Sequence, residues 1–471
     1  MGYSYDQLST YINEMRDAAI DSTMHLLGYG GSTSSGFDGG NPPVRVTPLG
    51  GHYEGSTMVQ GGQVTDPTGQ YAGTIVIPPG WPFHDLPSMV DYYNNAINEL
   101  FDDWWQMPRP DEFDGLVSSA QTAAHTLAFQ AQLNAGPGCA EFGANGSLAA
   151  IDTMNQYLSN FNGAAIRTFV ANYGNRLPLV THSQDAVACM VWSTVAGERE
   201  IWKRTRESIA DIAGQGLAAM KAADGGGGSG VKAVLNVVGA VAVIAAPFTA
   251  GTSEVAAAGI AAVGTVLQTS SDFVDDSAPK PVGLGGGTPI EVLANIRTAL
   301  DELSDQITQE ELGISRSMQK IDGLLDGGSA GDFTMANPGI LVDDNAGDFR
   351  AGGELKADWD TLRWIADEVM PQVTHQYKTA IAALEDCQSS DPFARPSGIG
   401  LSSVGPYLDW NSVVASLRLA VVQSKNQLDL VAEHLHLVAD DFQQTDAEIS
   451  AELEEHTREV KDTVYGTPGL P

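Results

Sequence analysis

Hydrophobic residues recur every three or four positions along most of this 471-residue chain. This spacing places them on one face of an α-helix, so it predicts amphipathic helices that pack against one another. Glycine, proline, serine and asparagine interrupt the pattern and mark the helix ends. We expect helices over about residues 4–27, 88–106, 111–134, 147–161, 163–173, 178–223, 289–326, 354–388 and 408–464.

Two of the longest predicted helices carry heptad seams, in which apolar residues repeat as they do in coiled coils. The first begins at Thr288-Pro289-Ile290-Glu291, a typical helix N-terminus with a capping residue and a proline in the first turn. Its seam consists of Leu293, Leu300, Ile307, Ile314 and Ile321. The second seam runs along the last helix: Val414, Leu417, Val421, Ser424, Leu428, Val431, Leu435, Val438, Phe442, Thr445 and Ile449.

These patterns predict an all-α fold, an elongated bundle of long antiparallel helices with coiled-coil-like seams. An N-terminal segment rich in glycine and proline is expected to be irregular, with room for a small hairpin at the β-like runs 44–46 and 74–77. Composition divides the chain into five segments. They are 1–87 (N-terminal helix and irregular segment), 88–224 (helical domain), 225–287 (apolar helical hairpin with glycine-rich linkers), 288–353 (heptad helix and acidic linker) and 354–471 (C-terminal helical hairpin).

Residues 231–271 are the least polar part of the chain, with Glu254 as the single charged residue after Lys232. The pattern predicts two apolar helices, about 231–246 and 254–268. A buried hairpin, a hairpin that inserts conditionally into a membrane and a permanent membrane span all fit this composition, since about 20 apolar residues cross a bilayer. The candidate membrane-contacting residues are Val237, Val238, Val241, Val243, Ile244, Phe248, Ile260, Val263, Val266 and Leu267.

The order of these elements resembles the layout of α-helical pore-forming toxins. In those proteins an uncharged hairpin lies between long helices, is hidden in the soluble form and is released at a membrane. The likeness concerns architecture, and it implies possible membrane contact through 231–271.

Charge excludes one class of partner. The chain has 59 acidic and 24 basic side chains, which give a formal net charge of −35. Such a surface repels the phosphate backbone, so we expect no nucleic-acid binding.

No pattern of residues indicates catalysis, a metal or a cofactor. The three cysteines, Cys139, Cys189 and Cys387, are far apart and are expected to be buried free thiols. The nine histidines form no metal-binding spacing, and the acidic run 343–348 lacks the glutamate that a calcium loop needs. We therefore expect a non-enzymatic protein without cofactor or metal.

The stretch Phe161-Asn162-Gly163-Ala164-Ala165-Ile166-Arg167-Thr168-Phe169 resembles the turn of the WXG-type helical-hairpin proteins that the type VII (ESX) secretion system exports. In that family an aromatic-x-Gly turn joins two helices. Here Phe161 and Gly163 would form the turn, with phenylalanine where the family has tryptophan. The resemblance implies a helical hairpin within 88–220.

A second stretch, Phe442-Gln443-Gln444-Thr445-Asp446, is similar to the Tyr-x-x-x-Asp export signal of such substrates. Residues four apart on a helix share a face, so Phe442 and Asp446 can be read together. Phe442 also belongs to the heptad seam, and a purely structural role explains it equally well.

The N-terminus lacks the apolar core of a signal peptide. We expect a protein that is secreted or displayed on the surface by a signal-peptide-independent route, with a cytoplasmic location as the alternative. Its expected activity is binding to a helical partner or to itself, with possible membrane contact. A scaffold or particle-assembly protein and the carrier part of a toxin are the alternative functions.

Overall fold

The computed structural model describes residues 3–27, 77, 80–129, 143–158, 173–223, 280–326, 333–335 and 359–465, together with four short strands between residues 29 and 65 and one at 232–235. The all-α fold class is confirmed. The described α-helices are α1 (Leu8–Leu26), α2 (Leu86–Phe101), α3 (Asp114–Leu127), α4 (Ala150–Leu158), α6 (Arg176–Lys221), α8 (Pro289–Asp326), α9 (Trp359–Trp364), α10 (Met370–Glu385) and α11 (Tyr407–Tyr465).

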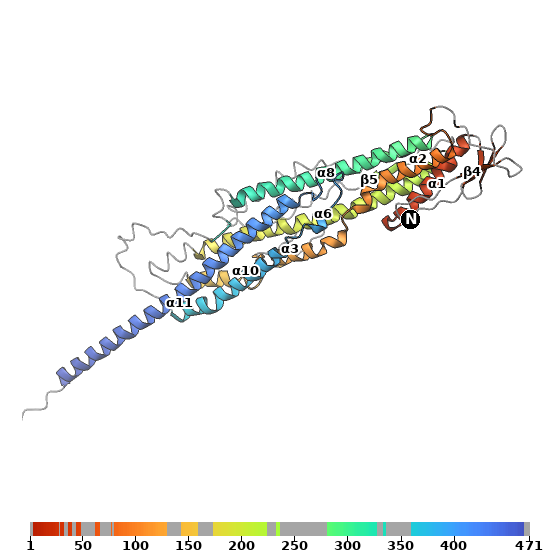
Figure 1. The fold of residues 1–471 in the computed structure, drawn as a ribbon. Helices are drawn as coiled ribbons and strands as arrows, with labels where there is room; N and C mark the ends of the chain where they lie inside the picture. The colour runs from red at the N-terminus through yellow and green to blue at the C-terminus, as the bar shows by residue number, and fades with distance from the viewer. Residues whose placement is uncertain are drawn as a thin grey trace, which may run out of the picture.

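Helix α6 is the central element of an elongated bundle (Figure 1). One end packs against α1, and the other against α3 and α11. Helix α8 lies alongside α6 and α11, while α10 packs between α3 and α11. Because α6 is covered from several sides, it buries both Trp192 and Trp202 completely.

Both heptad seams face this core. Helix α8 has the predicted bounds, and its first turn is capped by a hydrogen bond from the Glu291 N–H to the Thr288 hydroxyl at 3.3 Å. The five predicted seam residues of α8 are buried. On α11 the seam is buried at Val414, Leu417, Val421, Ser424, Leu428, Val431 and Leu435.

Two predicted helix boundaries were wrong. The helix expected over 111–134 begins as a short 3₁₀ turn at Pro110–Phe113 and ends with α3 at Leu127, where Ala128 has extended backbone. Asn145 explains this end, because its side-chain amide donates to the carbonyl of Thr126 at 2.7 Å and its backbone N–H donates to that of Ala128 at 2.7 Å. These carbonyls are thus satisfied without a further helical turn.

The helix expected over 354–388 is divided. Between α9 and α10 lies one π-helical turn, Ile365–Val369. Pro371 follows it in the first turn of α10. Proline lacks an N–H and its ring crowds the carbonyl four residues earlier, so the wider turn accommodates it.

Short strands occur in two places. The segment predicted to be irregular contains β1 (Tyr29–Ser32), β2 (Gly36–Gly39), β3 (Val44–Pro48) and β4 (Gly62–Thr65), an antiparallel sheet in sequence order that lies at the α1 end of the bundle in Figure 1. The run 44–46, expected to be β-like, is in β3.

The prediction that a helix begins near residue 231 was wrong. Residues Lys232–Leu235 form strand β5, which pairs antiparallel with β6 (Lys280–Gly283). Valine and leucine fit a strand as readily as a helix, so the apolar pattern alone did not distinguish them. The rest of the predicted apolar hairpin, 236–271, lies outside the described residues.

Helices from four of the five predicted segments share one hydrophobic core, since α1, α2, α6, α8 and α11 all contribute to it. The segment boundaries themselves stay predictions.

Candidate functional site

The residues predicted from sequence to carry function are only partly within the described structure. Phe442 and Asp446 lie on α11, whose backbone is helical through this region, so the two positions share a helix face. Phe161 and Gly163 lie outside the described residues. So do all ten candidate membrane-contacting residues from Val237 to Leu267.

Within the described ranges, no group of histidine, cysteine, aspartate and glutamate side chains could hold a metal ion. In that same part of the chain, no helix has the length and apolar character needed to span a bilayer. Cys189 and Cys387 are buried free thiols, as predicted, and Cys139 lies outside the described residues.

Among the described residues, the most exposed apolar feature is a row of leucines on α11. Leu408, Leu419, Leu430 and Leu437 expose 70, 57, 48 and 55% of their surface. They are spaced by eleven, eleven and seven residues, and eleven residues overshoot three helical turns by only about 20°. The four side chains therefore form one line, about 44 Å long at 1.5 Å per residue, which we call the leucine row.

The cations near the leucine row are already paired within the protein. On the α10 side Arg418 binds Glu385, and along α11 Lys425 binds Asp429 at 2.8 Å. Glu433, which is exposed beside Leu430 and Leu437, has no ion-pair partner among the described residues.

Carboxylates without a cation also line the α8 side of the leucine row. Asp322 accepts hydrogen bonds from Ser412 and Ser416 at 2.7 and 2.9 Å. Asp409 likewise accepts from the hydroxyl of Ser315. Because hydroxyl donors leave the negative charge in place, the flanks of the leucine row are acidic.

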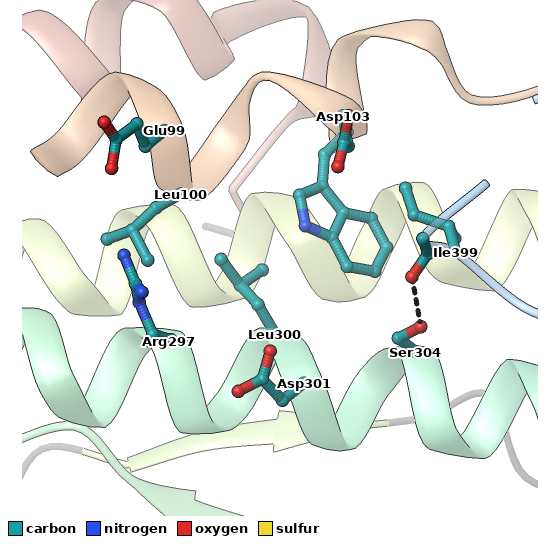
Figure 2. Close-up of a pocket in the computed structure, with 10 residues that line it drawn as sticks. Glu99, Leu100, Asp103, Arg297, Leu300, Asp301, Ser304 and Ile399 are labelled. Carbon is teal, nitrogen blue, oxygen red and sulfur yellow. Dashed lines mark hydrogen bonds between the residues drawn. The ribbon is translucent and has the colours of Figure 1, made fainter. Parts of the chain in front are cut away.

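A second feature is a hollow of about 310 Å³ between α2 and α8, which we call the α2–α8 pocket. Its polar lining includes Glu99 and Asp103 from the α2 side and Arg297 and Asp301 from α8, as Figure 2 shows. Its other lining residues are Leu100, Trp104, Leu300, Ser304, Gly398 and Ile399.

The rim at Gly398 and Ile399 belongs to the connection between α10 and α11. The Ser304 hydroxyl of α8 donates to the carbonyl of Gly398 at 3.1 Å, the dashed line in Figure 2. Two residues further on, the N–H of Gly400 donates to the same hydroxyl at 3.4 Å. The rim is thus attached to α8 by two hydrogen bonds.

Behind the rim lies a buried ion pair. The guanidinium of Arg395 contacts the carboxylate of Glu311 at 2.5 Å, and neither side chain is exposed. Arg395 also donates to the carbonyl of Ser402 at 2.9 Å and lies over the ring of Trp202. Glu311 accepts from the N–H of Leu401 at 2.7 Å. These contacts fix the same connection to α6 and α8.

Glu198 of α6 completes this cluster, and the indole N–H of Trp202 donates to it at 3.3 Å. Burial raises the pKa of Glu198 well above its ordinary value, and the negative charge of Glu311 raises it further. Burial also raises the pKa of Glu311 to about 7, although Arg395 opposes the shift. Glu311 contacts Arg395 directly, Glu198 lies within reach of the same positive charge, and burial favours the protonated form of both carboxyl groups.

Neither the leucine row nor the buried carboxyl cluster was predicted from the sequence. The eleven-residue spacing of leucines outside the α11 seam was a signal for the leucine row. The adjacent acidic residues Glu310 and Glu311, which lie between the seam residues Ile307 and Ile314 of α8, were a signal for a polar cluster on this helix. The partners of Glu311 could not be recognised, because they come from distant parts of the chain.

Comparisons with protein-family models, with curated proteins and with solved structures found no match.

Proposed function

We propose that this chain is a non-enzymatic helical binding protein whose leucine row docks a partner helix. The observation that supports this proposal is the exposure of four aligned leucines on a helix whose opposite face is buried. A line of leucines at these spacings can pack against the apolar face of an amphipathic partner helix, and the leucines would then be buried between the two helices. Exposed leucines aligned along one helix face are typical of surfaces that bind another helix.

The charges beside the leucine row favour a partner with basic flanks. Asp322, Asp409 and Glu433 present carboxylates without a cation, while Arg418 and Lys425 are neutralised internally. A second copy of this chain would present the same acidic flanks and be repelled. A helix with a leucine seam between lysine or arginine residues complements the surface.

Two synthetic helical peptides with identical leucine seams test this proposal, one with lysine and one with glutamate at the flanking positions. Fluorescence anisotropy with the full chain should show binding of the lysine peptide alone. L419S/L430S should weaken it at least about tenfold, since each substitution removes a buried leucine contact. Leu179→Ser is the matched control, because Leu179 is also exposed, at 40%, but lies on α6.

Equal binding by L419S/L430S, or binding of neither peptide, would refute the leucine row as a docking site. Light scattering tests the alternative that a second copy of this chain occupies the leucine row. A wild-type dimer that L419S/L430S abolishes would assign the leucine row to a second copy and refute the basic partner.

We further propose that the protein is a substrate of the type VII kind, with Phe442 and Asp446 as its export signal. The helical backbone of α11 at both positions supports this, since positions four residues apart share one helix face. Asp446→Ala should keep the protein folded but retain it in the producing cell. Asp441→Ala, which removes an equal charge elsewhere on α11, should be exported normally; continued secretion of Asp446→Ala would refute the signal.

Conditional membrane contact through 231–271 is a second candidate function. The pairing of β5 with β6 supports it, because it places the start of the apolar segment beside residues 280–283, which follow that segment in the sequence. Dye leakage from anionic liposomes, measured at pH 5 and pH 7, should occur with the wild type and be lost in V241D/V263D. Absence of leakage from the wild type at both pH values would refute it.

A further inference from the structure

The α2–α8 pocket has the features of a binding site, and it is separate from the leucine row. It is lined by Glu99, Asp103 and Asp301 against one cation, Arg297, so its lining carries a formal charge of −2 (1 − 3). Arg297 forms no ion pair within the described part of the chain. This negative charge favours a ligand group that carries a positive charge.

The apolar wall of the pocket sets the shape of that group. Leu100 and Leu300 lie between the carboxylates in Figure 2, and both are largely buried. Long cationic side chains bury their methylene stems on apolar surface and keep the charge at a polar rim. A volume of about 310 Å³ is small for a ligand pocket and suits one such side chain with its backbone.

Trp104 supplies an independent indication of a ligand. Its side chain lines the pocket, exposes only 5% of its surface and carries an indole N–H. Among the residues that the structure describes, none accepts a hydrogen bond from this N–H. This N–H is not enclosed by protein, so it is a free hydrogen-bond donor in the wall of the pocket that a ligand carbonyl can use.

The pocket is also preformed. The carbonyl of Trp104 accepts a hydrogen bond from Tyr5 at 2.6 Å, which fixes one wall. The opposite rim at Gly398 is attached to Ser304 and stands on the buried pair of Arg395 and Glu311. Because these walls are already fixed, binding costs little conformational entropy, and this favours affinity.

We propose that the α2–α8 pocket binds a lysine or arginine residue of a peptide segment. The cation lies between Asp103 and Asp301, the methylene stem packs on Leu100 and Leu300, and a backbone carbonyl of the segment accepts the N–H of Trp104. Binding here does not require the leucine row, and each proposal can fail without the other.

Three small probes test this inference: the Nα-acetyl N-methylamides of lysine, arginine and norleucine. The readout is the indole N–H signal of Trp104 in ¹⁵N-tryptophan-labelled full-length protein, assigned by its absence in Trp104→Phe. The lysine or arginine probe should shift this signal with a dissociation constant on the order of 1 mM. Norleucine, which has a similar stem and no charge, should not shift it.

D103N/D301N should weaken binding at least about tenfold, because two charge-assisted contacts are lost. Both aspartates are exposed, so the variant should fold normally. Asp91→Asn is the matched control, since Asp91 is an exposed acid on α2 outside the pocket. An equal shift with norleucine, unchanged binding by D103N/D301N, or no shift with any probe would overturn the proposal.

Discussion

Arg395 and Glu311 form an ion pair at 2.5 Å in the interior of the bundle, and neither side chain reaches solvent. This contact joins the connection between α10 and α11 to the middle of α8. Removing a charge from water is costly, and only a close opposite charge offsets that cost. The pair therefore attaches this connection to α8, in addition to the buried apolar anchors Phe393 and Ile399.

Replacement of Arg395 with methionine should destabilise the fold by about 3–5 kcal/mol, because it leaves Glu311 buried without a cation. Urea unfolding followed by circular dichroism measures this change. Arg418→Met is the control, since Arg418 and Glu385 form a partly exposed ion pair whose loss should cost less than about 1 kcal/mol. An equal decrease in unfolding free energy in the two variants would show that the buried Arg395 pair contributes no more to stability than the partly exposed pair.

The carboxyl cluster should make stability depend on pH. The folded-state pKa of Glu311, about 7, lies above its ordinary value of 4.5, so the folded protein binds a proton that the unfolded chain releases. Stabilisation from this group is complete below pH 4.5 and is lost as pH rises to about 7. Unfolding free energies of the wild type should fall relative to those of Glu311→Gln across this range, by on the order of 2 kcal/mol.

The comparison with Glu311→Gln is necessary because other groups titrate in the same range. Burial lowers the pKa values of His125 and His182, which makes stability rise with pH. Both proteins contain these histidines, so their contribution cancels in the difference. A difference that stays constant from pH 4.5 to 7.5 would contradict the raised pKa of Glu311.

Truncation of leucines should lower the unfolding free energy on one face of α11 and leave it almost unchanged on the other. Leu417 and Leu428 are buried, and each change to alanine should cost about 2–5 kcal/mol. Leu419 and Leu430 lie two residues further along and belong to the exposed leucine row. Their change to alanine should alter the unfolding free energy by less than about 0.5 kcal/mol in thermal or urea unfolding. A large loss at Leu419 or Leu430 would mean that the row supports the fold.

The buried thiols should be unreactive in the native protein. Burial raises the pKa of Cys387 to about 12, and Cys189 is equally enclosed. Thiolate is the reactive form, so a Cys139→Ser variant should release no colour from Ellman's reagent at pH 8 until it is unfolded. Rapid reaction of either thiol under native conditions would contradict its burial.

The sequence determined the helices and their inward faces. The seams at Leu293–Ile321 and Val414–Leu435 were recognised because helical periodicity is a local property of the chain. The division at Pro371 and the strand Lys232–Leu235 were missed, since short apolar runs and a proline near a helix start fit more than one backbone conformation.

Only the tertiary structure decided which leucines stay exposed and which charges are buried. Leu419 is as apolar as Leu417, and its exposure follows from the absence of a described helix against that face of α11. Glu198, Glu311 and Arg395 lie far apart in the sequence and meet because α6, α8 and the connection before α11 pack together. Long-range packing sets their burial and hence their pKa values, and no local pattern encodes it.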